Sequence, residues 1–398
     1  MVPARVALAR RKGRRRVNPL WIRTARVVNA LARRRIAFDV DLIPCGWDNV
    51  PFGKIWNWLR TESSVYAHPA RPWGMPTILQ IEPTSRCNLH CRVCPVGAGL
   101  GRDAGDMPPA LFERIIDEVC DYALLILFWD WGEPFLHPDA FRMIRYARQA
   151  GLRVVASTNG HIFADPRTAE RVVNSGLDVL VFSVDGMTQE TYQHYRAAGN
   201  LQQVMAGIRN VVEAKRCRGA REPLVNLRFI VMRHNEHEIP RLNEFAAALG
   251  VDAVALRKFH AVPDRRMRSN WAGADFVPTK REYQLPVLAP GSLEPIRVSA
   301  NPCRNLWNCP TIHWNGTVCS CFMDWGESRP LGVIGPQSLR EIWYGKAYRD
   351  LRKEFACNWR GDPLCGECAL GYVGGDVGQA ANAEVFMLKA VEGGSERR

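Results

Sequence analysis

The stretch Cys87-Asn88-Leu89-His90-Cys91-Arg92-Val93-Cys94 decides the fold, because it spaces three thiols as C-x3-C-x2-C directly after an apolar segment at 78–81. That segment is typical of a buried strand, so the thiols lie on one loop at its end. Three thiolates on one loop can hold three irons of a cubane cluster and leave the fourth iron without a protein ligand. An open metal position is a place where a substrate can bind. A structural zinc site would need a fourth ligand, and His90 lies inside the loop, where we expect it to point elsewhere.

From residue 77 to residue 258 the sequence alternates between strand-like and helix-like segments. We expect strands at 78–81, 124–129, 154–156, 179–184, 227–231 and 251–256, and amphipathic helices at 111–119, 138–149, 168–174, 202–216 and 239–249. Apolar strands that alternate with such helices predict a parallel sheet covered by helices. Six units are fewer than the eight of a full barrel. We therefore predict an α/β fold with a partial (β/α)6 TIM-like barrel and with its chemistry at the C-terminal ends of the strands.

Short polar segments follow three of these strands. Trp131-Gly132-Glu133-Pro134 follows the second strand, Ser157-Thr158-Asn159-Gly160 the third, and Ser183-Val184-Asp185-Gly186 the fourth. A carboxylate such as that of Glu133 can accept hydrogen bonds from an ammonium group. The guanidinium of Arg196, eleven residues beyond Asp185, can bind a carboxylate with two hydrogen bonds. Each segment alone could be a helix cap or a turn, and the specific signal is their order at successive strand ends.

The three cysteines and these strand-end segments together resemble the radical S-adenosylmethionine (SAM) superfamily. The resemblance implies a [4Fe–4S] cluster on Cys87, Cys91 and Cys94 whose open iron binds SAM. An electron from this cluster would split SAM into a 5′-deoxyadenosyl radical, which abstracts a hydrogen atom from the substrate. The SAM contacts that the resemblance implies are Trp131, Gly132, Glu133, Pro134, Ser157, Asn159, Ser183, Asp185 and Arg196. Two departures stand out, because Trp131 replaces the usual first glycine and Val93 a residue that is often aromatic.

A second group of thiols lies after residue 300, at Cys303, Cys309, Cys319, Cys321, Cys357, Cys365 and Cys368. Cys303, a glycine before Cys321, and the C-x2-C pair at Cys365 and Cys368 resemble the SPASM or twitch extension, which holds auxiliary iron–sulfur clusters. No cysteine follows Cys368, so the resemblance favours the shortened form with one auxiliary [4Fe–4S] cluster on these four residues. Cys309 competes for one ligand position. The same thiols could hold a structural zinc ion instead.

A fully ligated auxiliary cluster is suited to electron transfer. We therefore predict a radical SAM oxidoreductase that acts on an unknown substrate, either a small molecule or carbohydrate or a lipid-linked compound. An external donor of the flavodoxin or ferredoxin type would supply its electrons. One alternative is an enzyme that modifies peptides, or an epimerase in which Cys217, Cys319 or Cys357 donates a hydrogen atom. An alternative from another class is a non-enzymatic iron–sulfur redox sensor or electron carrier, which would have no use for Glu133.

The net charge of +13 is concentrated at the N-terminus, where residues 1–35 contain twelve Lys or Arg and no Asp or Glu. The rest of the chain is nearly neutral, which excludes a uniformly basic nucleic-acid-binding surface. Apolar residues at helical spacing between 20 and 31 predict a basic amphipathic helix that either packs on the body or contacts an anionic membrane. The sequence shows no apolar run of roughly 20 residues and no secretory h-region, so we expect a cytoplasmic protein with peripheral membrane contact through residues 1–35 as an open alternative.

These patterns divide the 398 residues into five segments. They are a basic N-terminal extension (1–75), a radical SAM core (76–258), a linker (259–300), a SPASM or twitch domain (301–370) and a C-terminal tail (371–398). Within the extension, the Trp-rich residues 47–73 are expected to pack on the body, and the end of the tail to be poorly ordered. Thirteen cysteines in a chain without an export signal favour metal binding over a disulfide framework.

Overall fold

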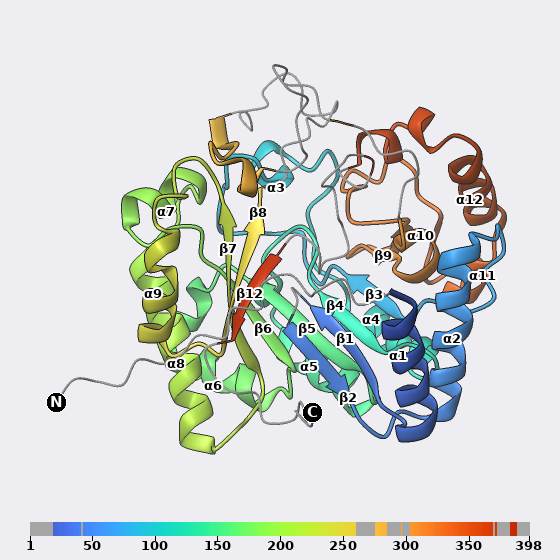
Figure 1. The fold of residues 1–398 in the computed structure, drawn as a ribbon, viewed down its shortest axis with the longest axis horizontal. Helices are drawn as coiled ribbons and strands as arrows, with labels where there is room; N and C mark the ends of the chain where they lie inside the picture. The colour runs from blue at the N-terminus through green and yellow to red at the C-terminus, as the bar shows by residue number, and fades with distance from the viewer. Residues whose placement is uncertain are drawn as a thin grey trace.

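A computed structural model of the protein describes residues 19–40, 43–259, 275–284, 296, 303–368, 371 and 383–387. Its centre is a ten-stranded sheet in the order β11-β10-β9-β3-β4-β5-β6-β7-β8-β12 (Figure 1). The six strands from β3 to β8 pair in parallel. They are β3 (Ile78–Ile81), β4 (Leu125–Phe128), β5 (Arg153–Thr158), β6 (Val179–Ser183), β7 (Leu224–Val231) and β8 (Ala253–Lys258). The predicted partial barrel is therefore confirmed.

Helices connect these strands and cover one face of the sheet. They are α4 (Pro109–Val119), α5 (Ala140–Gln149), α6 (Pro166–Asn174), α7 (Gln189–Tyr195), α8 (Leu201–Arg218) and α9 (Leu242–Leu249), with the short α3 (Pro95–Ala98) after the cysteines. Caps set several boundaries, as where the Asn200 side chain accepts from Gln203 N–H and Gly219 ends α8 in a left-handed conformation. The five predicted helices are confirmed, and α7 was not predicted.

The central strands are buried on both faces, which explains why they are continuously apolar. In β4, Ile126 and Phe128 belong to the core beneath the helices. Leu125 and Leu127 belong to a second core that includes Ile36 of the N-terminal extension. The extension therefore covers the inner face of the partial barrel.

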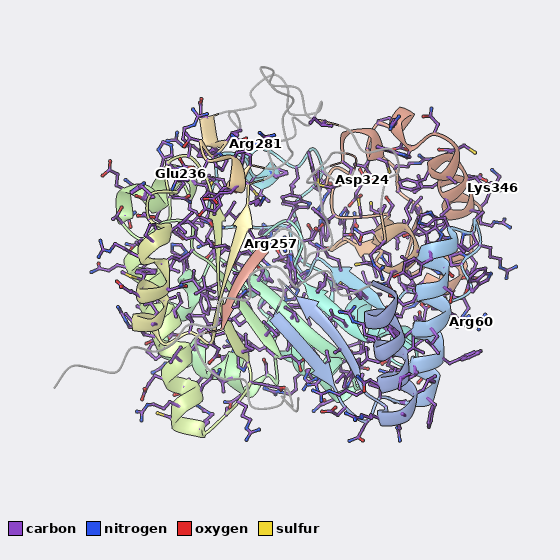
Figure 2. The ribbon with its side chains drawn as sticks, in the orientation of Figure 1. Arg60, Glu236, Arg257, Arg281, Asp324 and Lys346 are labelled. Atoms are coloured by element: carbon purple, nitrogen blue, oxygen red, sulfur yellow. The ribbon has the colours of Figure 1, made fainter. Side chains whose placement is uncertain are left out.

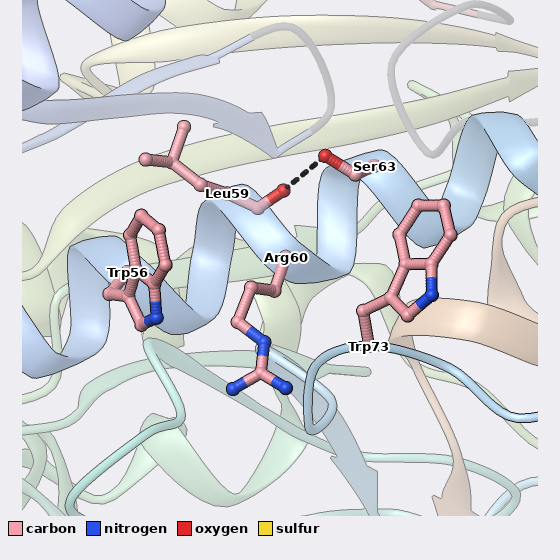
Figure 3. Close-up of a pocket in the computed structure, with 5 residues that line it drawn as sticks. All are labelled: Trp56, Leu59, Arg60, Ser63 and Trp73. Atoms are coloured by element: carbon pink, nitrogen blue, oxygen red, sulfur yellow. Dashed lines mark hydrogen bonds between the residues drawn. The ribbon is translucent and has the colours of Figure 1, made fainter.

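The N-terminal extension consists of α1 (Pro19–Arg33), the antiparallel hairpin β1 (Ile36–Val40) and β2 (Ile43–Trp47), and α2 (Phe52–Ala67). The predicted helix near residues 20–31 is confirmed, and the hairpin was not predicted. Lys54 of α2 donates to the carbonyl of Gly151 at 2.9 Å, and burial lowers its pKa to about 8. The outer side of α2 holds a depression of about 610 Å³ between Trp56 and Trp73 (Figure 3). No helix among the described residues is long and apolar enough to cross a bilayer.

The C-terminal region extends the same sheet. Its elements are α10 (Asn305–Asn308), β9 (Thr311–Ile312), β10 (Thr317–Cys319), β11 (Gly332–Val333), α11 (Leu339–Trp343) and α12 (Lys346–Asn358). The turn between β9 and β10 contains Gly316 at φ +87°, and α11 begins after Ser338, which forms a capping box with Glu341. Strand β12 (Ala383–Met387) of the tail was not predicted and pairs with β8. Most of the predicted linker lies outside the described residues, and the five-segment division stays a prediction.

Candidate active site

The thiol loop, residues 87–94, lies at the C-terminal end of β3 against the end of α7. Two backbone hydrogen bonds hold it there, because His90 N–H donates to Ala197 O and Arg92 N–H donates to Tyr195 O, both at 3.2 Å. The loop therefore takes its shape from a segment about a hundred residues further along the chain.

The three thiols of the loop are free and largely withdrawn from solvent. Cys91 is buried, and Cys87 and Cys94 are half-buried. Burial raises the pKa of Cys87 to about 11 and that of Cys94 to about 12. Burial also raises the pKa of Cys91, and the neighbouring Arg196 guanidinium partly offsets this increase. Thiolates gathered in such a place need positive charge beside them, so the donor set fits an iron–sulfur cluster.

Residues 131–134 follow β4 and are attached to the start of the thiol loop. Glu133 N–H donates to the carbonyl of Arg86 at 2.8 Å. Gly132 has φ +130°, and a Cβ there would overlap the carbonyl oxygen of Thr84 and lie 3.0 Å from that of Arg86. Glycine alone suits this close approach between two backbone segments.

Glu133 is buried and points toward the end of β5. The Thr158 hydroxyl donates to Oε1 at 2.8 Å, and Asn159 N–H donates to Oε2 at 2.6 Å. Burial raises the pKa of Glu133 to about 7, and the hydrogen bonds from Asn159 and Thr158 partly offset this effect. An ammonium group placed beside this carboxylate would favour its charged form. The site therefore suits a ligand with an amino group, and Thr158 is a contact that the sequence did not predict.

Asp185 and Arg196 form a buried ion pair behind the thiol loop. Arg196 Nε and Nη2 lie 2.7 and 2.6 Å from Asp185 Oδ2, and the Asp185 side chain is fully buried. Ile230 N–H donates to the other carboxylate oxygen at 2.8 Å. Arg196 is thereby fixed next to Cys91, and its contact with a ligand carboxylate stays a prediction.

Ser157 and Ser183 end neighbouring strands, and their hydroxyl oxygens lie 3.5 Å apart. Arg228 of β7, which the sequence did not single out, donates to Ser157 Oγ at 3.3 Å. Asn159 Nδ2 donates to Asn88 Oδ1 in the thiol loop at 2.7 Å. The strand-end segments and the thiol loop therefore form one continuous site.

The second thiol group lies in the C-terminal region, where three chain segments bring four cysteines near one another. Burial raises the pKa of Cys321, and the charges of Cys368 and Cys303 raise it further. Burial, the nearby Asp362 and the other three thiols raise the pKa of Cys365 in the same way. Asp362 also accepts a hydrogen bond from Cys365 N–H at 2.7 Å, which fixes the C-x2-C turn.

Cys309 remains a competitor for a ligand position, since it is buried and its charge interacts with those of Asp130 and Cys303. Within the ranges described above, no three His, Cys, Asp or Glu side chains converge closely enough to hold a single metal ion. In a cubane each iron takes a different thiolate, so the sulfurs need not converge on one point. The ligand sets of both thiol groups stay predictions.

A buried network of charged side chains joins the barrel to the C-terminal region and was not predicted. His313 lies 3.0 Å from Glu327 through Nδ1 and 3.3 Å from Asp130 through Nε2. Arg102 Nη2 lies 2.5 Å from Glu82 Oε1 in the same interface. Burial opposes protonation of His313, but the nearby carboxylates of Asp130 and Glu327 raise its pKa to about 9. The imidazolium thus balances two carboxylates where unpaired charges would be costly.

Sequence comparison places these features among known proteins. The radical SAM superfamily profile matches residues 81–246, and the SPASM iron–sulfur cluster-binding domain profile matches residues 303–369. A Pyrococcus furiosus protein, the tungsten-containing aldehyde ferredoxin oxidoreductase cofactor-modifying protein, is 31% identical over 322 residues, which cover 73% of this chain and 87% of that protein. An AdoMet-dependent heme synthase from Methanosarcina barkeri is 34% identical over 192 residues, covering 48% of this chain and 52% of the synthase. The chain therefore spans about half the length of this second relative.

The crystal structure of Streptococcus suis SuiB bound to S-adenosylmethionine superposes with a TM-score of 0.54 and 15% identity, covering 84% of this chain and 78% of SuiB. This likeness supports the fold. A thiol loop after the first barrel strand and a thiol-rich C-terminal region are the features that the two matched profiles share with this chain. The chain belongs to the radical SAM superfamily and carries a SPASM domain. Its cofactors are SAM and two [4Fe–4S] clusters, as predicted.

Proposed function

We propose that the protein is a radical SAM oxidoreductase whose substrate is a small molecule or carbohydrate, or a lipid-linked compound. The observation that carries the proposal is the close association of three free thiols with Glu133 and Asn159 at neighbouring strand ends. A redox sensor or electron carrier would need the thiols but not a buried carboxylate aimed at the same site.

Different residues of the site would bind the first cluster and the ammonium group of SAM. When bound, the first cluster supplies the electron that splits SAM and generates the 5′-deoxyadenosyl radical. Cys87, Cys91 and Cys94 would hold that cluster, and Glu133 would accept hydrogen bonds from the ammonium group of SAM. The burial of Glu133 and Cys91 keeps water away from the place where a reactive radical must survive.

The C-terminal thiols favour an oxidation as the net reaction, because an auxiliary cluster bound there could accept an electron from the substrate radical. An epimerisation would need a thiol that can reach the substrate radical. Cys217 and Cys357 are exposed on α8 and α12, and Cys319 is fully buried. Two of these thiols therefore face solvent and the third is enclosed, which supports oxidation over hydrogen donation.

One relative favours the small-molecule class, although a Gluconobacter oxydans relative, 28% identical over 181 residues, is a PqqA peptide cyclase. The Pyrococcus relative, 87% of whose length this chain covers, is described as modifying a cofactor. Modification of a peptide is the alternative within the same superfamily. We propose an external flavodoxin- or ferredoxin-type protein as the electron donor, since the first cluster must be reduced once for each SAM that it cleaves.

The decisive measurement of the proposed activity is 5′-deoxyadenosine formation. The protein is reconstituted anaerobically with iron and sulfide, and SAM and dithionite are added. We expect 5′-deoxyadenosine from the native chain and only background from a variant with Cys87, Cys91 and Cys94 all replaced by alanine. Equal amounts from the two proteins would refute an enzymatic role and leave the electron-carrier alternative.

We also propose that α1 contacts anionic membranes at their surface. Val28 and Leu31 lie one helical turn apart and are 55% and 48% exposed. Arg33, Arg34 and Arg35 follow them, and the first 35 residues carry no acidic side chain. Exposed apolar side chains with a basic surround suit the headgroup region of an anionic bilayer.

Liposome flotation tests this contact. We expect the full chain to float with vesicles that contain anionic lipid and not with neutral ones. Deletion of residues 1–35 should abolish flotation, and Val28→Ser with Leu31→Ser should weaken it by about tenfold, since both side chains would lose apolar burial. Unchanged flotation after the deletion would eliminate the proposal.

A further inference from the structure

The indole of Trp131 crosses from the barrel to the C-terminal region. Its Nε1–H donates to the carbonyl oxygen of Phe322 at 2.7 Å. Its ring packs edge-on against Trp325 with the centroids 5.7 Å apart, and lies 6.5 Å from the ring of Phe322. Arg102 donates to the Trp325 carbonyl at 2.6 Å and so fixes the backbone that carries this ring. The contacts of the indole are therefore made mostly with residues of the C-terminal region.

Phe322, whose carbonyl accepts the hydrogen bond from Trp131, directly follows Cys321, a candidate ligand of the auxiliary cluster. Asp324 makes the loop after Cys321 rigid, because its own N–H donates to the Cys321 carbonyl at 3.1 Å. Its carboxylate accepts from the N–H groups of Ser328 at 2.8 Å and Arg329 at 3.0 Å. Figure 2 labels Asp324 on the side of the C-terminal region that faces the middle of the molecule. A movement of the Phe322 carbonyl is therefore passed on to Cys321.

On its other side Trp131 is continuous with the candidate SAM-binding residues. It immediately precedes Gly132 and Glu133, which are packed on and bonded to the segment that leads into Cys87. The positive φ of this turn falls at Gly132 and not at Trp131, so the chain accepts a large side chain where the family usually has glycine. Trp131 is thus a rigid link between the two cofactor sites that a glycine could not provide.

We propose that Trp131 is a positioning residue that couples SAM binding to the auxiliary cluster, which rests on the assignment of Glu133 and Cys321 to the two sites. SAM bound at Glu133 would shift residues 131–134, and the indole would transmit this shift to the Phe322 carbonyl and Cys321. Hydrogen bonds and packing around cluster ligands tune a cluster's reduction potential. Coupling between two binding sites is typically about fivefold or more, and it acts in both directions.

The test follows both clusters by electron paramagnetic resonance (EPR) during a redox titration, with and without SAM. In the native protein we expect SAM to change the spectrum of the first cluster and to shift the midpoint potential of the auxiliary cluster. A fivefold coupling corresponds to about 40 mV for a one-electron couple. Trp131→Phe keeps the ring and loses the hydrogen bond, and Trp131→Gly loses both. We expect the auxiliary shift to shrink in the first variant and to vanish in the second, each measured at a SAM concentration that saturates the response of the first cluster.

Trp314→Phe is the matched control. The Trp314 indole also joins the C-terminal region to the barrel, but its hydrogen bond goes to the carbonyl of Asp103, at 3.2 Å, and not to the residue after Cys321. We expect this variant to keep the full auxiliary shift. An unchanged shift in Trp131→Gly, or an equal loss in Trp314→Phe, would overturn the proposal.

The outcomes separate this inference from the proposed function. If the first cluster of the native protein ignores SAM, the proposed function fails. If it responds and the auxiliary potential does not move, only the role of Trp131 fails. Should a Trp131 variant not assemble its clusters, the reverse measurement in an otherwise native chain decides. SAM affinity of the native chain should then differ by about fivefold between the oxidised and the reduced auxiliary cluster, and equal affinities would overturn the coupling.

Discussion

Gly132→Ala is expected to lower the free energy of unfolding by roughly 3 kcal/mol or more and to prevent assembly of the first cluster. The residue has φ +130°, which an alanine adopts only under strain. The added methyl group would overlap the carbonyl oxygen of Thr84, and it would lie 3.0 Å from that of Arg86. Both obstacles are backbone atoms that lead directly into Cys87, so they cannot move aside without displacing the thiol loop.

Chemical unfolding of the cluster-free protein and the iron content after reconstitution measure these two effects. Gly219→Ala at the end of α8 is the matched control, because its φ is also positive, at +60°, but no atom lies within 4 Å of the added Cβ. The control should lose about 1 kcal/mol and keep its iron. Similar losses in the two variants, or normal iron in Gly132→Ala, would show that the close approach to the thiol loop is unimportant.

Glu133→Gln is expected to weaken SAM binding by about a hundredfold and to leave the iron content unchanged. Removing one partner of a buried, hydrogen-bonded charge pair typically costs about 2–5 kcal/mol. The glutamine keeps the size of the side chain but places an amide where the ammonium group of SAM needs an acceptor. Equilibrium dialysis with SAM, together with an iron assay, measures both quantities.

Native SAM binding should also depend on pH through the same carboxyl group. Burial raises the pKa of Glu133 to about 7, so the group is mostly ionised at pH 7.5 and mostly protonated at pH 5.5. Only the ionised form attracts an ammonium group, so affinity should fall by roughly 25-fold as the pH drops across this range. Glu133→Gln should show no such fall, whereas Glu213→Gln on the exposed side of α8 should behave like the native protein. A variant that keeps the native pH profile would remove Glu133 from the SAM site.

The barrel could be predicted from the sequence because its strands and helices are long enough to show their periodicity. Apolar runs such as 125–128 are buried on both faces, and the helices between them carry a clear apolar stripe. The short elements could not be predicted. Strand β2 contains Pro44 and Gly46, which argue against a strand, and β9 has only two residues. These strands exist because a partner strand supplies the hydrogen bonds that their own residues do not favour.

The candidate site likewise contains residues that could be predicted from the sequence and residues that could not. Residues at the ends of successive parallel strands meet at one edge of the sheet, so the position of Glu133 could be predicted from the order of the segments. The hydrogen-bond partner of Trp131 could not be predicted, because it lies 191 residues away. It is a backbone carbonyl, and every residue has one, so no residue type marks its position. His313 and Asp130 were missed for the same reason, since a lone histidine after a short strand carries no local sign of its acidic neighbours.

The pairing of β9 with β3 has a consequence for how the chain can be divided. Because β9 lies parallel to β3 and next to it in the sheet, the C-terminal region supplies the neighbour of the strand that leads into the thiol loop. A chain that stopped before residue 303 would leave β3 with bare N–H and C=O groups along one side. Exposed strand edges of this kind recruit other chains and promote aggregation. The two regions therefore match separate sequence families but share one sheet, and we expect the first region alone to aggregate.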